Sequence, residues 1–510
     1  MAPAMSTVRR ITFDSGPWPL YGTDASRQVE ALAAAACAPH TLMQRAGEAT
    51  ARLAIALAPH GQSIWIAAGP GNNGGDGYEA ACRLQQAGRQ VRVTALGAVE
   101  RHGADAAASL ARAQAAGVQI EPSLPTNVEC DLAIDAVFGL GTGRAAGGPF
   151  ADALRLFNRL RGPRLAVDLP SGLDSDHGFV HGEIGAQATH TLALLTLKPG
   201  QFTDHGREQC GEVWFDDLGS GDAMAAVPPQ AWLGGADAAL EVPAPRQHAR
   251  HKGSFGDVII VGGAAGMGGA ALLAGRAALV AGAGRVYVSA LDPAAPQVDT
   301  LWPELMLRPD LWRANGTAIG SATVVCGCGG GNAVREALPL LMARAARLVL
   351  DADALNAIAA DGGLQTLLMA RAGRGQATVL TPHPLEAARL AGITGAAEVQ
   401  SDRLGQAQRL AERLGCVVLL KGSGSVIAAP KLSSHINASG NARLASAGTG
   451  DVLAGWLGGL WAAAQAQVPP ASPHRVAQAA AWLHGAAAEN SGDRTPLTAS
   501  SLLLRLAAVG

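Results

Sequence analysis

The run Ser63-Ile64-Trp65-Ile66-Ala67-Ala68 leads directly into Gly69-Pro70-Gly71-Asn72-Asn73-Gly74-Gly75-Asp76-Gly77. The first six residues are typical of a buried strand, and we expect a helix over Tyr78–Gln86 after the glycine loop. Glycine lets a backbone approach a ligand closely, so N–H groups at a helix start can converge on a phosphate. A turn that only packs the strand against the helix is the alternative. Three polar side chains in one tight turn favour the ligand site.

The same alternation continues on both sides of this loop. Further strand-like runs are expected at Val91–Ala95, Leu132–Val137, Leu165–Val167 and Thr191–Leu195, with a helix over Ala104–Ala115. Strands that alternate with helices predict a mostly parallel sheet covered on both faces. Ligands bind such sheets where the strands end, and the glycine loop lies at such an end.

A second α/β pattern begins after residues 220–245, which are rich in Pro, Gly and Ala and are predicted to be a linker. Strands are expected at Val258–Val261, Val286–Ser289, Thr323–Val325, Leu348–Leu350, Thr378–Leu380 and Val417–Leu420, with helices over Ala270–Ala281 and Asp451–Trp461. A chain of 510 residues is too long for one core, so two unlike domains fit. We predict a first domain at 26–219, preceded by an extension at 1–25, and a second domain at 246–508.

Composition narrows the class of protein. The formal net charge of -2 gives no reason to expect nucleic acid or an anionic membrane surface as a partner. No apolar run approaches the ~20 residues of a spanning helix. Seven scattered cysteines favour a reduced protein without a disulfide framework, and no export signal is visible. We expect a cytoplasmic homo-oligomer that acts on small molecules.

Polar residues follow three neighbouring strands of the first predicted sheet. Asn73, Asp135 and Ser171 should meet there, because the carboxyl ends of parallel strands lie side by side. Amide, carboxylate and hydroxyl oxygens form a site for a hard cation. Asp168 follows the same strand as Ser171 and could move protons. Turn or cap roles for Asp135 and Asp168 are the alternative.

The second domain ends with a different glycine loop, Gly448-Thr449-Gly450-Asp451, which opens an apolar helix. Free N–H groups at this helix start could stabilise charge on a transferring phosphoryl group, and Asp451 could accept a proton. An N-cap role is the alternative for Asp451. Lys421 and His383 also follow strands, although a solvated lysine and a structural histidine remain open. Asp351 and Asp353 could likewise be helix caps.

The motifs Gly69–Tyr78, Asp135–Gly143 and Val167–Asp174 together resemble the N-terminal epimerase module of the NAD(P)H-hydrate repair enzymes. The resemblance covers about Ser26 to Gly219 and implies a Rossmann-like three-layer sandwich. It implies K⁺ at Asn73, Asp135 and Ser171, and Asp168 at the reacting nicotinamide hydrate. It implies that the hydrated dinucleotide binds Asn72, Asn73, Gly74, Gly75, Asp76, Gly139, Leu140, Gly141, Thr142, Gly143, Arg144, Ala145 and Asp168.

The later motifs, from His251–Gly256 to Gly448–Asp451, resemble the dehydratase module of the same family, of ribokinase-like fold, over about Arg246 to Ala507. The resemblance implies ADP as co-substrate, with Mg²⁺ expected beside the nucleotide, and Asp451 as the base. It implies hydrate contacts at Ala270, Gly329, His383 and Asp451, and ADP contacts at Lys421, Gly422, Ser423, Gly424, Ser425 and Gly450.

Three stretches depart from the family pattern. Gly327-Cys328-Gly329-Gly330-Gly331 replaces a usual Gly-Pro-Gly-Leu-Gly, Leu385 replaces a commoner glycine, and Ala442-Arg443-Leu444 replaces Pro-Gly-Met. These departures leave Asp451 and His383 intact and affect the backbone contacts expected of the Gly327–Gly331 loop.

The sequence therefore predicts epimerisation and ADP-dependent dehydration of damaged NAD(P)H, with AMP and phosphate as products. A ribokinase-like small-molecule kinase fused to a non-catalytic Rossmann-like binding module is the alternative.

Overall fold

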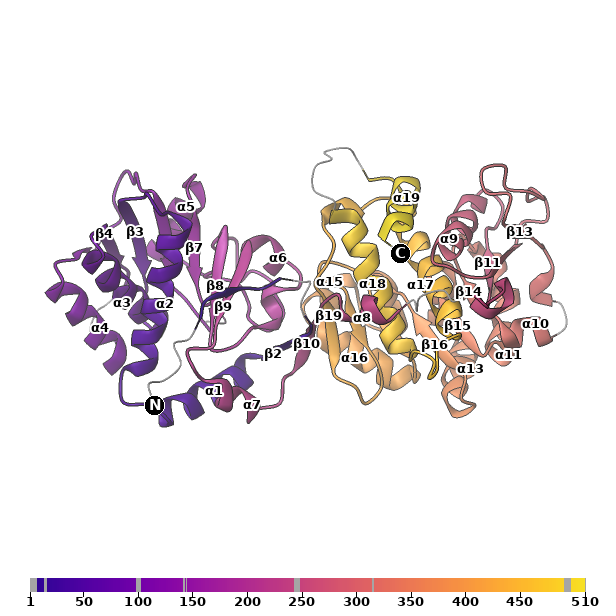
Figure 1. The fold of residues 1–510 in the computed structure, drawn as a ribbon, viewed down its shortest axis with the longest axis horizontal. Coiled ribbons are helices and arrows are strands. Elements are labelled where there is room, and N and C mark those ends of the chain that lie inside the picture. The colour runs from indigo at the N-terminus through magenta and orange to yellow at the C-terminus, as the bar shows by residue number, and fades with distance from the viewer. Residues whose placement is uncertain are drawn as a thin grey trace. The chain divides into compact units, whose positions relative to one another are not determined.

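The computed structural model describes residues 7–12, 16–97, 102–140, 143, 145–242, 248–313, 316–489 and 497–509. The chain forms two compact units, residues 1–12 with 19–231 and residues 13–18 with 232–510. Each unit is built around its own large sheet, so the prediction of an α/β chain with two domains is confirmed (Figure 1).

The first unit contains an eight-stranded sheet. Its order is β1 (Arg9–Arg10), β9 (Glu212–Asp216), β8 (His190–Leu194), β7 (Arg164–Val167), β6 (Leu132–Ala136), β3 (Ser63–Ala68), β4 (Gln90–Ala95) and β5 (Gln119–Glu121). Neighbouring strands are parallel from β9 to β5, and only the short edge strand β1 runs antiparallel. The carboxyl ends of the central strands therefore share one edge, as the sequence predicts.

Helices cover both faces of this sheet because its central strand is apolar on both sides. Ile64, Ile66 and Ala68 share a core with α2 (Thr41–Leu57), α3 (Asn72–Gln86) and α4 (Ala104–Ala115). Trp65 and Ala67 point the other way and pack with Leu154 and Phe157 of α5 (Pro149–Arg159). This period of two gives a three-layer sandwich.

Helix α3 begins at Asn72, whereas the sequence predicts a start at Tyr78. The glycine loop is thus itself the first turns of the helix. A Cβ at Gly74 would lie 1.8 Å from the carbonyl oxygen of Gly69, and one at Gly77 would lie 2.6 Å from the Ala136 Cβ. Glycine is a poor helix former, but here its missing side chain lets the helix start press against the strand ends.

The second unit is built on an eleven-stranded sheet. Its order is β13 (Met306–Leu307), β12 (Arg285–Ala290), β11 (Asp257–Gly262), β14 (Thr323–Cys326), β15 (Arg347–Leu350), β16 (Ala377–Leu380), β17 (Val417–Leu420), β18 (Val426–Ala428), β19 (Ser434–Asn437), β10 (Ala231–Gly234) and β2 (Trp18–Leu20). The strands from β13 to β17 are parallel, and β18 and β19 continue the sheet as an antiparallel hairpin.

Five helices share one core with this sheet: α8 (Asp237–Glu241), α9 (Gly268–Val280), α17 (Thr449–Ala464), α18 (Pro473–Glu489) and α19 (Ala499–Val509). Three others lie outside that core and contact β14, β16 and β17: α11 (Val334–Arg344), α13 (Gly362–Gly373) and α16 (Arg403–Leu414). The sheet is therefore a layer between helices, like the first one (Figure 1).

Helix α17 lies unusually close to α9. A Cβ at Gly455 would lie 2.0 Å from the carbonyl oxygen of Ala274, and one at Gly459 would lie 2.5 Å from that of Ala278. A Cβ at Gly458 would lie 2.4 Å from Val325 of the sheet. Real Cβ atoms do not approach other atoms so closely, so only glycine permits this packing.

The segment that the sequence predicts as a linker contains regular elements. It includes α7 (Gly221–Ala225), strand β10 and α8 (Asp237–Glu241), while residues 243–247 lie outside the described ranges. Arg475 of α18 binds Asp237 at 2.7 Å and Glu241 at 2.8 Å, which fixes α8 on the second unit. Composition indicated turns here, but the described part of the segment forms helices and a strand that pack against the rest of the fold.

All seven cysteines are free. Among the residues that the structure describes, no helix combines the length and the apolar character that a membrane span requires.

Candidate active sites

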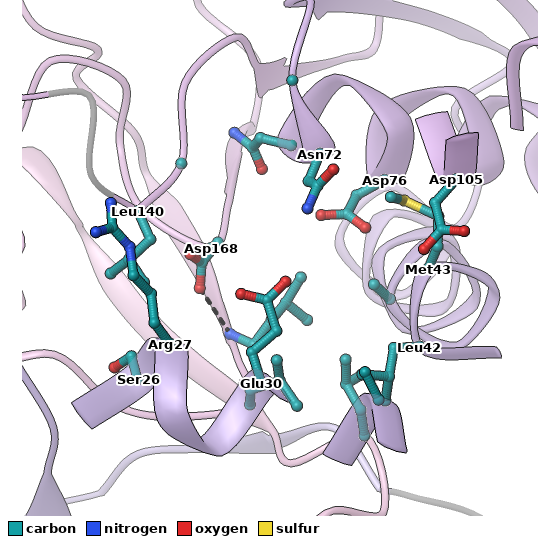
Figure 2. A pocket seen from close by; sticks show the side chains of 18 of the residues that line it. Ser26, Arg27, Glu30, Leu42, Met43, Asn72, Asp76, Asp105, Leu140 and Asp168 are labelled. Carbon is teal, nitrogen blue, oxygen red and sulfur yellow. Dashed lines mark hydrogen bonds between the residues drawn. The ribbon is translucent and has the colours of Figure 1, made fainter. Parts of the chain in front are cut away.

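A cavity of about 750 Å³ opens at the carboxyl edge of the first sheet (Figure 2). Six of the residues that the sequence selects line it: Asn72, Asn73, Asp76, Gly139, Leu140 and Asp168. Gly143 and Ala145 are described but are not part of this lining, and Gly141, Thr142 and Arg144 lie outside the described residues. Gly74 and Gly75 are likewise absent from the lining, so the cavity brings together six of the thirteen predicted contacts.

Asp168 follows β7 and is held by its neighbours. Its φ of +66° is in the left-handed region, which a residue with a side chain rarely adopts. The N–H of Leu194 donates to its carboxylate at 3.2 Å, and Lys198 donates to the same oxygen. Backbone strain at a cavity wall is typical of functional residues.

Lys198 is a site residue that sequence reasoning missed. Its side chain is only 2% exposed, and its ammonium also donates to the Leu194 carbonyl at 2.9 Å. Gln201 accepts a bond from the Lys198 N–H at 2.9 Å and donates to the Asp168 carbonyl at 3.0 Å. Lys198 and Gln201 therefore fix both the backbone and the side chain of Asp168.

Asp135 and Ser171 meet beneath the cavity, and both are fully buried. The Ser171 N–H donates to Asp135 at 2.8 Å and its hydroxyl donates at 2.6 Å. Burial raises the pKa of Asp135 to about 6, while the Ser171 bonds act in the opposite direction. A nearby cation would offset the cost of this buried carboxylate.

Asn73 is the third residue predicted to hold a cation. Its side chain is buried, and neither amide atom has a hydrogen-bond partner. A Cβ at Gly139 would lie 3.3 Å from the Asn73 side chain, and the preceding residue, Phe138, donates its N–H to the Ser171 hydroxyl at 2.8 Å. A buried amide without partners is rare and indicates a missing ligand.

Three more carboxyl groups line the cavity: Asp76 of α3, Glu30 of α1 (Thr23–Ala35) and Asp105 of α4. Burial raises the pKa of Asp76 well above its usual value, and the charges of Asp168 and Glu30 raise it further. Glu30 was missed by sequence reasoning, because it lies in an ordinary helical pattern before the first motif.

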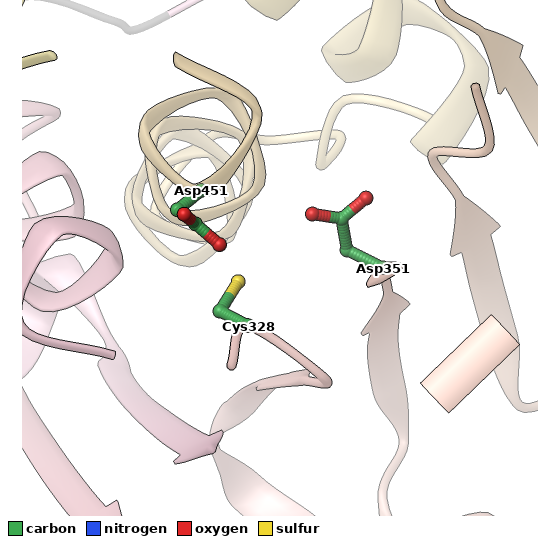
Figure 3. Close-up of side chains that lie close together, drawn as sticks. All are labelled: Cys328, Asp351 and Asp451. Carbon is green, nitrogen blue, oxygen red and sulfur yellow. The ribbon is translucent and has the colours of Figure 1, made fainter. Parts of the chain in front are cut away.

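The second site lies where α17 begins. The Sγ of Cys328 and carboxylate oxygens of Asp351 and Asp451 lie within 4.8 Å of one another (Figure 3). Burial first, and then the charge of Asp351, raise the pKa of Asp451 to about 6, while a hydrogen bond from Cys328 acts to lower it. Asp451 is in the first turn and not at the N-cap, which is Gly448, so the N-cap alternative is wrong.

Lys421 joins this group from the end of β17. Its ammonium donates to Asp351 at 2.7 Å, and Thr381 donates to the same oxygen at 2.8 Å. Burial acts to lower the pKa of Lys421, but Asp351 and Glu386 raise it above its usual value. A Cβ at Gly450 would lie 3.4 Å from the ammonium, so a cation faces the glycine turn. Lys421 is not a freely solvated lysine.

Ala270 and Gly329 are also brought together. A Cβ at Gly329, which has a φ of +58°, would lie 2.9 Å from the Ala270 Cβ. Asp353 accepts a bond from the Gly331 N–H at 2.8 Å, which ties the Gly327–Gly331 loop to α12 (Ala352–Ala359). The departure from the family pattern therefore still gives an ordered loop, with Cys328 at its base.

His383 is the N-cap of α14 (Pro384–Ala391). Its Nδ1 accepts from the N–H groups of Leu385 and Glu386 at 3.1 and 3.2 Å. A nitrogen that accepts carries no proton, so Nε2 is protonated in the neutral ring. Burial and the charge of Lys421 lower the pKa of His383, yet its side chain is 47% exposed. The capping role is structural, and Nε2 lies 3.3 Å from a carboxylate oxygen of Glu386, so both ring nitrogens have partners in the first turn of α14.

Arg403 supports the loop Lys421–Ser425 and is a third residue that sequence reasoning missed. Arg403 is 1% exposed and donates to the carbonyls of Lys421 and Gly424, each at 3.3 Å. Gly422, with a φ of +143°, leaves room for the guanidinium, since a Cβ there would lie 2.7 Å from it.

Known proteins match both units. Residues 39–200 match the family described as YjeF-related protein N-terminus, and residues 258–507 match that described as NAD(P)H-hydrate dehydratase. The bifunctional NAD(P)H-hydrate repair enzyme of Escherichia coli is 34% identical over 88% of this chain and 85% of its own length. That of Coxiella burnetii is 33% identical over 93% and 95%. An ADP/ATP-dependent NAD(P)H-hydrate dehydratase from Bacillus subtilis, crystallised with ATP and Mg²⁺, covers 53% of this chain and 94% of its own, at 28% identity and a TM-score of 0.44.

Two α/β units, each with acidic and glycine-rich groups at the carboxyl edge of a parallel sheet, define a two-site enzyme for nucleotide-like substrates. The chain belongs to the family of bifunctional NAD(P)H-hydrate repair enzymes.

Proposed function

We propose that the first unit interconverts the R and S hydrates of NADH and NADPH, and that the second unit dehydrates the S hydrate at the expense of ADP. The observation that carries this proposal is the presence of two separate acid sites on one chain, Asp168 in its cavity and Asp451 at the start of α17.

In the first unit, Asp168 is proposed to move protons to and from the hydrate at its hydroxyl-bearing centre. Lys198 and Gln201 hold the carboxylate in place, which supports this role because proton transfer depends on position. We propose that Asn72–Asp76 and Gly139–Ala145 bind the dinucleotide, with Gly139 and Leu140 supplying part of the cavity wall.

In the second unit, Asp451 is proposed to remove the hydroxyl proton of the S hydrate while the hydroxyl oxygen attacks the terminal phosphorus of ADP. AMP leaves, and Lys421 together with the N–H groups of Gly448–Gly450 stabilises the charge in transfer. The new phosphate ester then breaks with help from the ring nitrogen, a neighbouring carbon loses a proton, and NAD(P)H is restored. Phosphate leaves far more readily than hydroxide.

Residues near each step suit the remaining contacts. We propose that Ala270, Gly329 and His383 contact the hydrate and that Lys421–Ser425 contact ADP. The short distance from Gly329 to Ala270 and the support of the Lys421–Ser425 loop by Arg403 favour these assignments.

The donor atoms beneath the first cavity fit a K⁺ ion. Asn73 offers a buried amide without partners, and Asp135 and Ser171 offer carboxylate and hydroxyl oxygens. Bound there, K⁺ would supply positive charge near the dinucleotide. Mg²⁺ is expected with ADP, and the oxygens of Asp351 and Asp451 are the acidic donors that would face it. Cytoplasmic location and homo-oligomeric assembly stay predictions from the sequence.

Mixed R and S hydrates with ADP test the whole proposal, with the return of NADH absorbance as the readout. Conversion of both epimers at an enzymatic rate supports both activities. Fast conversion of one epimer, with the other lagging at its spontaneous rate, would leave only the dehydratase. A stable phosphate ester without NADH would instead favour the small-molecule kinase.

A further inference from the structure

Glu30 shares the first cavity with Asp168, although it comes from a different element. It projects from α1, whereas Asp168 follows β7, and Figure 2 shows both carboxyl groups directed into the same space. The positive charges of Lys198 and Arg27 act to lower the pKa of Glu30, and the negative charge of Asp168 acts to raise it. The Asn72 side chain, at the start of α3, lines the same cavity.

The two acids have different surroundings. Asp168 is paired with the buried ammonium of Lys198, which suits an ionised carboxylate. Burial and the charge of Asp168 raise the pKa of Glu30, while Lys198, Arg27 and the Asn72 side chain act to lower it by less. Neighbouring acids in unlike environments commonly divide the roles of base and acid between them.

We propose that Glu30 is the second proton-transfer residue of the epimerase site and works as the acid partner of Asp168. This inference rests on the proposed epimerase function of the first unit. It gives Glu30 a direct role at the substrate, not a role through another residue.

Inversion of the hydrate needs two proton transfers, which one carboxylate serves poorly. The hydroxyl-bearing carbon is bonded to the ring nitrogen. Asp168 takes the hydroxyl proton as the carbon–oxygen double bond forms, and the carbon–nitrogen bond breaks. Glu30 gives its proton to the nitrogen, which keeps the bonding electron pair. The open form holds an aldehyde and an enamine, and nothing is oxidised or reduced.

Ring closure reverses these steps on the other face of the aldehyde. Rotation about the carbon–carbon bond presents that face, the nitrogen attacks, its proton returns to Glu30, and Asp168 returns its proton to the oxygen. The hydrate then has the opposite configuration, and both acids are in their original states.

Glu30→Gln is the decisive variant, because glutamine keeps the shape and the polarity of the side chain but carries no transferable proton. Purified R hydrate is incubated without ADP, so that the dehydratase stays idle, and the S hydrate is measured by chromatography. We expect kcat to fall about 100-fold or more with KM nearly unchanged. Glu30→Asp, which keeps the carboxyl group on a shorter stem, should restore part of kcat.

Two controls separate the possible failures. Glu48→Gln, an exposed acid on α2, should leave the epimerase rate unchanged, and ADP-dependent conversion of S hydrate should be normal in every variant. A wild-type kcat in Glu30→Gln, or a rise in KM alone, would overturn the role of Glu30 while leaving the epimerase function intact. Absence of epimerisation in the wild-type protein would instead refute the proposed function itself.

Discussion

Replacing Lys198 by methionine tests whether the buried ion pair organises the first site. Methionine has a similar length but no charge, so the change removes the ammonium that Asp168 and the Leu194 carbonyl share. The Lys198 side chain is 2% exposed and that of Asp168 is 15% exposed. The variant therefore leaves a carboxylate that water reaches only from the cavity.

The expected magnitude follows from that burial. Removing one partner of a buried pair typically costs about 3–5 kcal/mol. Access of water to Asp168 from the cavity offsets part of this, so we expect the N-terminal unit to lose about 2–3 kcal/mol of unfolding free energy. For a unit of this size that corresponds to a fall of roughly 5–10 °C in its melting temperature.

Activity should fall more steeply than stability. Asp168 loses the contact that aims it, and a catalytic group displaced by ~1 Å costs on the order of 100-fold in rate. R-to-S conversion without ADP measures the epimerase, and calorimetry measures the melting temperature. Lys431→Met, a change of the same type at an exposed turn, should alter neither. A Lys198→Met protein with wild-type epimerase rate and melting temperature would refute the reasoning.

Three further outcomes are expected. Because burial raises the pKa of Asp451 to about 6, the carboxylate becomes protonated as pH falls through that value, and the dehydratase kcat at saturating ADP should drop about tenfold per pH unit below it. A kcat that stays constant down to about pH 5 would exclude Asp451 as the base. Gly455→Ala should lower the unfolding free energy by about 1–3 kcal/mol in denaturant titration, because its Cβ would lie 2.0 Å from the Ala274 carbonyl oxygen. Gly362→Ala, with open space around it, should change the unfolding free energy by less than about 0.5 kcal/mol, and equal effects of the two changes would contradict the close packing of α17. K⁺ in place of choline should raise the melting temperature and epimerase rate of the wild type but not of Asn73→Ala, and an equal response of both proteins would argue against a cation at the Asn73 amide.

Apolar runs made the strands predictable. The predicted strands Ser63–Ala68 and Val417–Leu420 have the same bounds in the structure, because a short apolar run between turn residues is typical of a fully buried strand. Elements decided by long-range packing were not predictable in the same way. The first turns of α3 are helical because Gly74 and Gly77 fit against strand ends that lie far along the chain or behind a turn.

The site residues divide in the same way, into those that a sequence motif marks and those that only the fold brings to the site. Residues inside motifs, such as Asp168 and Asp451, could be selected from the sequence, since glycines and strand ends mark them. Glu30, Lys198 and Arg403 act through neighbours that only the fold supplies. One signal was available for Lys198: it is the only lysine among the first 251 residues, and it lies shortly after the apolar strand that ends at Leu194.

The glycines of α17 determine where the first turn of this helix lies. Asp451 lies in its first turn, and Gly455, Gly458 and Gly459 lie in the next two, flush against α9 and the sheet. Asp451 therefore lies at the end of a helix that is held by close packing more than one full turn away from the reacting groups. Larger residues at these three glycines would displace the start of α17. They would lower activity as an active-site mutation does, although they contact no substrate.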